Sequence, residues 1–481
     1  MADETNKGEM NKFDWFSPTD FRYYVKELVP YLSETAFTQY KGKVELALAK
    51  ALAKHGLCLE ESVTEVEKAV GEVTTQEVYD EEDRIRHDIK ALVNMIRKRV
   101  SDKTKPTIHA TATSYDIIDS ANALRFRDAI LDIILPDMVK LERTFIEIAR
   151  REKDTLQIGR THGQHAEPIT FGFEIAQYVN RWGTRILKVK EAADSLVGKF
   201  SGAVGAYNAS SLFFDEREEF EAGVLEAPEE FEAEILEELG LKPALISTQI
   251  VTPEPTTDLM HAVTTAFGVL ANYARNMRNL QRTEIAEVGE PFEEGQVGSS
   301  TMPQKKNPIN FENIEGIWKE FMPRIVTNYM DQVSEHQRDL TNSVTQRYIP
   351  ESLAMLDFAV RRANRVSKKL TVNPANMIRN FEMSADKIIA EPLQILLAFY
   401  GHPDSHEKVR LLVMESYRTG ISLRDIMLRD EEIKSYLQKF TPRQIDIISD
   451  PRKYTGIASR KAQRTADIWE EKIKLQEKLK K

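Results

Sequence analysis

Three long segments with helical periodicity constrain the fold of this 481-residue chain more than any other feature. In residues 119–153, 171–200 and 257–288, apolar side chains recur every three or four positions, which is the spacing of one face of an α-helix. At 1.5 Å per residue, helices of this length reach roughly 45 Å. An apolar stripe of that length needs partners all along it. The pattern therefore predicts an all-α protein built around a bundle of long helices.

The segments on either side of these three predict the domain organisation. Helices at residues 311–335 and 350–370 are expected to complete the central bundle, and shorter patterns precede and follow it. We expect an N-terminal helical domain (1–114), a central bundle domain (115–371) and a C-terminal helical domain (372–481). A bundle this elongated is expected to assemble with copies of itself.

Several shorter stretches carry more local predictions. Residues 81–100 are predicted to form one charged helix that contains Arg86, His87 and Asp88. The acidic insert at 214–238 is expected to cover the outside of the bundle as a solvated surface. The Lys- and Glu-rich tail at 467–481 is expected to be a solvated helix.

The composition excludes several classes of protein. A formal net charge of −10 argues against broad nucleic-acid binding, so an anionic substrate would need a local group of Arg and Lys. The single cysteine, Cys58, excludes an internal disulfide and fits a reducing compartment. The N-terminus is polar, and no apolar run approaches the ~20 residues of a membrane span. We therefore expect a cytoplasmic protein without a membrane partner.

The loop at residues 298–308 interrupts the helical pattern. Gly298 is conformationally permissive, and Pro303 and Pro308 each remove a backbone donor. Hydroxyl, ammonium and amide groups are concentrated between Ser299 and Asn307, a composition that suits holding an anion and moving a proton. A solvated surface loop would fit the same composition.

A polar cluster at residues 109–116 precedes one of the long helices. Thr113 and Ser114 lie where a helix begins, so they are candidates for capping its free N–H groups. The same helix N-terminus could instead bind a carboxylate or phosphate.

A second polar cluster, at residues 159–168, contains two histidines. His162 and His165, with Glu167, invite a metal interpretation, but zinc sites usually show tighter motifs. Because histidine titrates nearest neutrality, a general acid is the better functional interpretation.

A third cluster contains Arg338, Ser343 and Arg347. In one straight helix, nine residues turn through about 900°, which would place the two arginines on opposite faces. We therefore expect a break near residues 340–343, after which both arginines and the hydroxyl could hold a phosphate. A solvated ion-pair network is the alternative interpretation.

Together these motifs resemble the fumarase/aspartase superfamily of β-elimination lyases, whose signature the loop at 298–308 matches. Within that superfamily the chain is most similar to the adenylosuccinate lyase family, over nearly its whole length. The similarity rests on residues 21–23, 86–88, 113–116, 159–168, 201–206, 247–249, 298–308, 338–347, 400–404 and 451–456.

The resemblance implies a fold, an assembly and a reaction. The fold is the three-domain fumarase/aspartase type, whose central bundles form the twenty-helix core of a homotetramer with active sites shared between subunits. The reaction is β-elimination of fumarate from adenylosuccinate, giving AMP, and from the succinyl-carboxamide ribotide of purine biosynthesis. No metal or organic cofactor is implied.

The resemblance also implies roles for individual residues. It makes Ser299 the general base and His162 the general acid. It implies that Glu312 pairs with Lys305 and fixes its direction. The substrate-binding residues that it implies are Arg22, Tyr23, Arg86, His87, Asp88, Thr113, Ser114, Gln249, Ser300, Lys305, Lys306, Asn307, Asn313, Arg338, Ser343 and Arg347.

Two stretches depart from the pattern of the adenylosuccinate lyase family. Residues 304–306 (Gln-Lys-Lys) are closer to argininosuccinate lyase, because adenylosuccinate lyases usually have a His before the Lys. Residues 250–255 contain no arginine, where many family members have some. Argininosuccinate lyase is therefore the alternative enzyme, and a structural protein that kept a lyase fold is the non-enzyme alternative.

Overall fold

The computed structural model describes residues 15–214, 226–292, 295, 298 and 300–478. By the density of its internal contacts the chain forms two units, each made of three segments. The first unit contains Met1–Met138, Arg185–Gly268 and Gly316–Arg361, and the second contains Val139–Thr184, Val269–Glu315 and Arg362–Lys481. The three-domain division stays a prediction.

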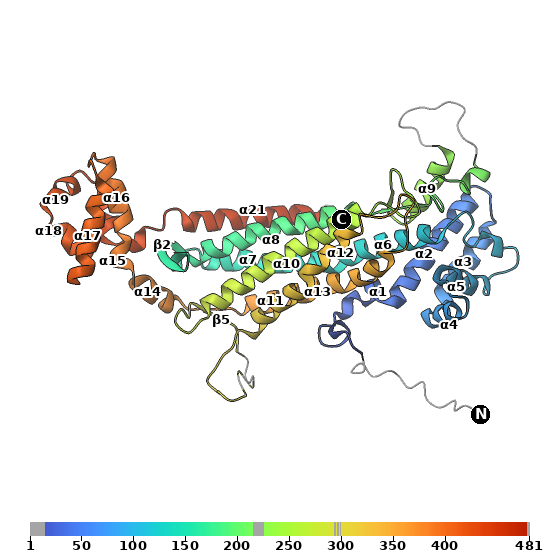
Figure 1. Ribbon diagram of the computed structural model, residues 1–481, viewed down its shortest axis with the longest axis horizontal. Coiled ribbons are helices and arrows are strands. Elements are labelled where there is room, and N and C mark those ends of the chain that lie inside the picture. The colour runs from blue at the N-terminus through green and yellow to red at the C-terminus, as the bar shows by residue number, and fades with distance from the viewer. Residues whose placement is uncertain (1–14, 215–225, 293–294, 296–297, 299, 479–481) are drawn as a thin grey trace. The chain divides into compact units, whose positions relative to one another are not determined.

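The predicted all-α fold class is confirmed, because long helices dominate both units (Figure 1). Helix α6 (Ser114–Ala129) continues through one π-helical stretch (Ile130–Ile134) into α7 (Leu135–Arg151). The π-helical stretch ends two residues before Pro136, which has no N–H for a regular i→i−4 bond.

The other long helices also lie where the periodicity predicts them, with shifted ends. They are α8 (Phe171–Asp194), α10 (Glu254–Leu280) and α13 (Asn342–Lys368). The predicted single helix at 311–335 is wrong. Helix α11 (Ile309–Phe321) is followed by a 3₁₀ turn that contains Pro323, and a short α12 (Ile325–Met330) comes after it.

Aromatic side chains fill the core of the second unit. The ring of Tyr273 on α10 lies 4.8 Å from Phe145 on α7 and 5.2 Å from Tyr178 on α8. Phe311 on α11 packs edge-on against the same tyrosine at 5.8 Å. The buried Tyr273 hydroxyl bonds to Ser367 on α13 at 2.8 Å, so its polar group is satisfied.

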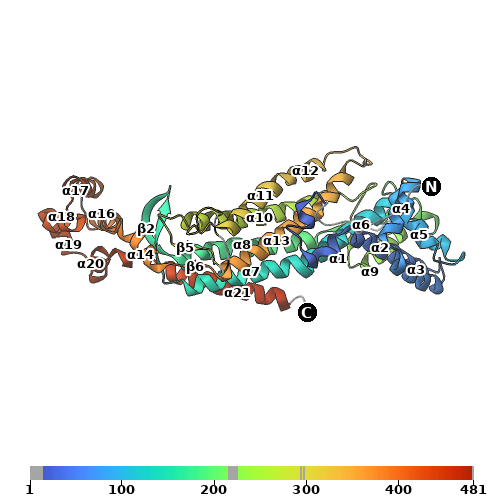
Figure 2. The same cartoon turned by 90° about the horizontal axis from the view of Figure 1, so that it is seen from below.

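The C-terminal helix α21 (Ala458–Lys478) lies along α7 and α8 in the second unit (Figure 2). Its Trp469 is buried against Gly183, where a Cβ atom would meet the indole at 2.3 Å, and donates a hydrogen bond to Asn180. The prediction of a solvated tail is therefore wrong for this face of the helix.

Shorter helices make up the rest of both units. The acidic insert is only partly described, because residues 215–225 lie outside the described part; its helix α9 (Ala227–Glu238) buries Phe231 and Ile235, so it is not simply a solvated surface. The remaining α-helices are α1 (Val29–Leu32), α2 (Glu34–Lys54), α3 (Glu60–Glu72), α4 (Thr75–Ile85), α5 (Asp88–Arg97), α14 (Pro374–Glu382), α15 (Ala385–Ile388), α16 (Ala390–Phe399), α17 (Ser405–Thr419), α18 (Leu423–Arg429), α19 (Glu431–Leu437) and α20 (Pro442–Ser449).

Strands are few and short in the described residues. An antiparallel hairpin pairs β1 (Leu156–Thr161) with β2 (Gln164–Thr170). In the other two pairs each strand has only two residues. These pairs are β3 (Val197–Gly198) with β4 (Lys242–Pro243), and β5 (Val288–Gly289) with β6 (Thr371–Val372).

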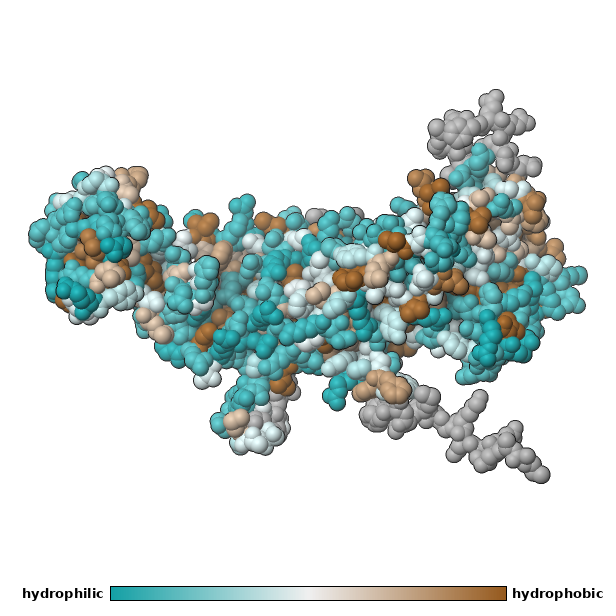
Figure 3. All heavy atoms as spheres, viewed as in Figure 1, coloured by the Kyte–Doolittle hydropathy of each residue, from teal (hydrophilic) through white to brown (hydrophobic). Residues whose placement is uncertain are grey.

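On the face shown in Figure 3, apolar residues occur in small groups among polar ones. None of the described helices is both long and apolar enough to cross a membrane.

Candidate active site

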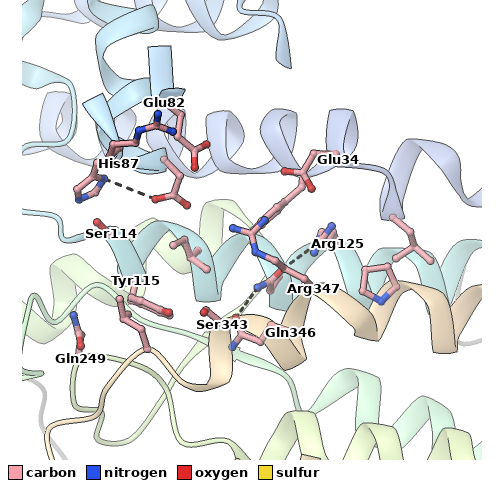
Figure 4. Close-up of a pocket in the computed structure, with 18 residues that line it drawn as sticks. Glu34, Glu82, His87, Ser114, Tyr115, Arg125, Gln249, Ser343, Gln346 and Arg347 are labelled. Atoms are coloured by element: carbon pink, nitrogen blue, oxygen red, sulfur yellow. Dashed lines mark hydrogen bonds and ion pairs between the residues drawn. The ribbon is translucent and has the colours of Figure 1, made fainter. Parts of the chain in front are cut away.

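A cavity of about 640 Å³ lies in the first unit, between the α4–α5 junction, the start of α6, the loop before α10 and the start of α13 (Figure 4). Seven of the predicted substrate-binding residues line it, although they come from four separate parts of the sequence. They are Arg86, His87, Asp88, Ser114, Gln249, Ser343 and Arg347.

A sharp turn between α4 and α5 presents the first three of these residues. The prediction of one helix at 81–100 is wrong, because Arg86 adopts a left-handed conformation (φ 58°) and ends α4. His87 is extended and caps α5, its ring Nδ1 accepting the Lys90 N–H at 3.2 Å. A neutral His87 therefore carries its proton on Nε2. This break lets all three side chains line the cavity.

The start of α6 divides the predicted capping and binding roles between two residues. Thr113 and Asp116 form a capping box, with the Thr113 N–H donating to the Asp116 carboxylate at 2.7 Å. Thr113 is not among the cavity residues, whereas Ser114 is. Asp116 is held from behind by Lys199, whose ammonium group also donates to the Gly202 carbonyl at 2.9 Å.

The loop that carries Gln249 is fixed by a buried carboxylate. The Val251 N–H donates to Asp119 on α6 at 2.9 Å, which holds the backbone two residues after Gln249. The second carboxylate oxygen of Asp119 has no hydrogen-bond partner in the described part of the chain. Burial raises the pKa of Asp119 to about 7.

Replacing Asp119 with Asn should change how stability depends on pH. A carboxyl group whose folded pKa is raised weakens the fold as it ionises, so its cost is absent near pH 4 and fully present above about pH 7. Urea denaturation measures the free energy of unfolding. For the unmodified protein this free energy should fall, relative to that of Asp119→Asn, by up to about 1.4 kcal/mol for each pH unit in this window. Parallel pH profiles for the two proteins would contradict this expectation.

The third cluster confirms the predicted break but not the pairing of its arginines. Helix α13 begins only at Asn342, and Arg338 before it has a φ of 76°. Arg338 donates to the Asp331 carbonyl at 2.8 Å and does not line the cavity, whereas Ser343 and Arg347 do. The expectation that both arginines and the hydroxyl meet one anion stays a prediction.

The other predicted residues near the N-terminus lie outside this cavity. The Tyr23 ring packs edge-on against Phe358 at 5.2 Å, and Arg22 is exposed. Neither residue is among those that line the cavity.

The sequence analysis missed the other residues that line the cavity, among them Asn122, Arg125 and Gln346. Arg125 donates to Asn122 at 2.9 Å, and Asn122 donates to Gln346 at 3.2 Å (Figure 4). Helical periodicity could have found Arg125. It follows Ser114 by eleven residues, about three turns, and so lies on the same face of α6.

His162 lies in the second unit, at the tip of the β1–β2 hairpin. Thr161 pairs with Gln164, so His162 and Gly163 form a two-residue turn in which both have positive φ (53° and 74°). This is the geometry of a type I′ turn. The turn leaves the His162 side chain exposed.

The signature loop lies between α10 and α11 in the second unit. Asn307 donates to the Gly298 carbonyl at 3.0 Å and closes the loop, and a Cβ at Gly298 would meet the Lys305 carbonyl at 2.0 Å. Ser299 lies outside the described residues. Ser300 is exposed.

A cavity of about 830 Å³ adjoins this loop and is strongly cationic. Lys305 and Lys306 line it and are exposed. The ion pair that the resemblance implied between Glu312 and Lys305 is not the one present, because Glu312 lies 3.8 Å from Arg278. The predicted Asn313, on α11, is half-buried, and its side-chain oxygen has no hydrogen-bond partner among the described residues.

The histidine cluster shows no metal-binding arrangement in the part of the chain that the structure describes. His165 Nδ1 lies 2.8 Å from the Ser384 hydroxyl, a hydrogen bond that orients the ring. No group of three or more His, Cys, Asp or Glu side chains suited to a metal ion occurs among the described residues.

Two family models match this chain, and both describe lyases. The family described as Lyase matches residues 21–322, and the family described as Adenylosuccinate lyase C-terminal matches residues 334–445. An adenylosuccinate lyase from Pyrococcus abyssi is 38% identical over 426 residues, covering 87% of this chain and 91% of the relative. One from Archaeoglobus fulgidus is 34% identical over 451 residues, covering 93% and 97%. The chain belongs to the adenylosuccinate lyase family and is a carbon–nitrogen lyase.

Solved structures show the same fold at lower sequence identity. A 3-carboxy-cis,cis-muconate lactonizing enzyme from Pseudomonas putida has a TM-score of 0.80 at 24% identity, covering 94% of this chain and 99% of that one. A fumarate lyase from Mesorhizobium sp. BNC1 has a TM-score of 0.78 at 22% identity, covering 92% and 98%.

Proposed function

We propose that this protein is an adenylosuccinate lyase. It would cleave adenylosuccinate to AMP and fumarate, and remove fumarate from the succinyl-carboxamide ribotide of purine biosynthesis. The observation that carries the proposal is the first-unit cavity, which brings Ser343 and Arg347 from α13 together with Arg86, His87 and Ser114. This is the set of donors and cations that an anionic nucleotide requires.

The proposed mechanism removes a proton next to a carboxylate and expels an amine nitrogen. Ser299 takes the proton, and His162 protonates the leaving nitrogen. The carbanion delocalises into the carboxylate, so fixed positive charge must meet the developing dianion. Lys305 is suited to this task because it is exposed beside a cationic cavity and makes no ion pair in the described part of the chain.

The signature loop has to create a dry, cationic site, because a free serine hydroxyl is a weak base. Asn307 contributes in the structure by closing the loop onto Gly298. In the proposed complex, Asn307 and Ser300 also contact the succinyl carboxylates. The Gln281 side chain donates to the Lys306 carbonyl at 3.3 Å, which ties the loop to α10.

We also propose a cytoplasmic homotetramer with active sites shared between subunits. Exposed apolar side chains on α12 and the start of α13 support association of copies. They include Met330 on α12 and Val344 on α13, which are 67% and 61% exposed, and Val333 in the segment between these helices is 84% exposed. Sedimentation velocity measures the mass of the particle directly, and a monomer at micromolar concentration would contradict the tetramer.

Turnover of two substrates tests the proposed reaction. We expect loss of succinyl-adenine absorbance with adenylosuccinate and no fumarate release from argininosuccinate. Argininosuccinate carries no phosphate and would leave Arg347 and Ser343 without a ligand. The second substrate is included because Gln304-Lys305-Lys306 resembles argininosuccinate lyase. Fumarate release from argininosuccinate alone would replace the proposal with that enzyme, and no turnover of either would favour a structural protein.

A further inference from the structure

We propose that Arg125 binds the phosphate group of the nucleotide together with Arg347, as a residue of the site that the family resemblance does not assign. This inference rests on the proposed function, because it names a further binding residue for the same substrate. The ligand chemistry is a phosphate monoester dianion.

The placement of Arg125 leaves its terminal nitrogens available. Its guanidinium lies 3.9 Å from the centre of the Phe37 ring, and its Nε donates to Asn122 at 2.9 Å. These contacts fix the plane of the group. In the described part of the chain its two Nη atoms make no hydrogen bond, although the residue is only 3% exposed and lines the cavity.

Neither Arg125 nor Arg347 has an ion-pair partner in the described part of the chain. Glu34, Glu82 and Asp88 line the same cavity, but among the described residues none of them lies within ion-pair distance of Arg125 or Arg347. Burial is the main cause that lowers the pKa of Arg125; Glu34 raises this pKa, and Arg347 lowers it by less than Glu34 raises it. Because Arg125 and Arg347 line one cavity and neither forms an ion pair among the described residues, a dianion between them could accept hydrogen bonds from both guanidinium groups.

The polar network behind Arg125 holds it in register with α13. Asn122 accepts from Arg125 and donates to Gln346, the residue directly before Arg347. These hydrogen bonds tie Arg125 on α6 to Gln346 on α13, one residue before Arg347. Two neighbouring guanidinium groups on ordered helices suit the bidentate recognition of phosphate.

Calorimetric binding to the full-length protein tests the proposal with four probes: AMP, adenosine, inorganic phosphate and fumarate. In Arg125→Met, which keeps an apolar contact with Phe37, the AMP dissociation constant should rise at least about tenfold. Adenosine and fumarate binding should stay unchanged, and any binding of inorganic phosphate should weaken. Lys68→Met, which removes one positive charge from an exposed side chain of α3, should leave AMP binding unchanged.

Two outcomes would overturn the role of Arg125. One is unchanged AMP affinity in Arg125→Met, and the other is an equal loss of adenosine or fumarate affinity. Arg125→Lys keeps the positive charge but loses the paired N–H donors of the guanidinium group, so it should weaken AMP binding by less than Arg125→Met does. The melting temperature of the Lys variant checks that it is folded. Turnover of adenylosuccinate by the unmodified protein is measured separately. Its absence counts against the proposed function, whereas normal turnover with unchanged AMP affinity counts against Arg125 alone.

Discussion

Replacing His162 with Asn is expected to lower kcat by at least about a hundredfold, the scale of general acid–base catalysis, while leaving the fold intact. His162 has a φ of 53° in a two-residue turn followed by Gly163. Asn-Gly is the dipeptide that type I′ turns favour, so Asn keeps the backbone and removes only the titratable ring. Loss of succinyl-adenine absorbance measures kcat, and circular dichroism checks the fold.

The same loss is expected for Ser299→Ala, since the proposed base would be gone. Ser299 lies outside the described residues, so this expectation rests on the match to the lyase signature. Ser300→Ala is the matched control, because it removes the neighbouring hydroxyl and should cost far less. Near-normal turnover in either His162→Asn or Ser299→Ala would remove that residue from the proposed mechanism.

Replacing Lys199 with Met is expected to lower the free energy of unfolding by about 3–5 kcal/mol, the usual cost of breaking a buried ion pair. The Lys199 and Asp116 side chains are both fully buried and bonded to each other. Without the ammonium group, Asp116 would remain as an uncompensated charge directly beneath the start of α6. Urea denaturation followed by circular dichroism measures the loss.

The double variant Lys199→Met with Asp116→Asn separates the stranded charge from the lost packing. Asn at position 116 removes the charge. Its side-chain oxygen can still accept the hydrogen bond that the Thr113 N–H donates to the Asp116 carboxylate. We expect the double variant to recover a large part of the stability lost in Lys199→Met. If Lys199→Met alone is as stable as the unmodified protein, the pair does not stabilise the fold.

Local patterns predicted the long helices well, because an apolar stripe depends only on residues three and four positions apart. The stripe along residues 119–153 is α6 and α7, and the one along 257–288 is α10. The break before α13 followed from the same geometry. The family resemblance supplied the signature loop, since its spacing is contiguous in the sequence. These features needed no knowledge of distant contacts.

Sequence reasoning failed where a non-glycine residue adopts a left-handed backbone. Arg86 ends α4 in this conformation, and without it the residues 86–88 would be spread around one helix. His162 starts a type I′ turn in the same way. The free-energy cost of such a conformation is offset by the helix cap or the strand pairing around it. Local helix propensities do not include these interactions.

By itself the sequence determined the helical fold class, the signature loop and the family to which the chain belongs, because these depend on local periodicity and contiguous motifs. Only the tertiary structure decided which side chains share a cavity. It placed Arg125 beside Arg347 and turned Arg338 to the Asp331 carbonyl. The physical reason is that a binding site is formed by elements that meet through long-range packing. Its charges are set by neighbours that lie far apart in the chain.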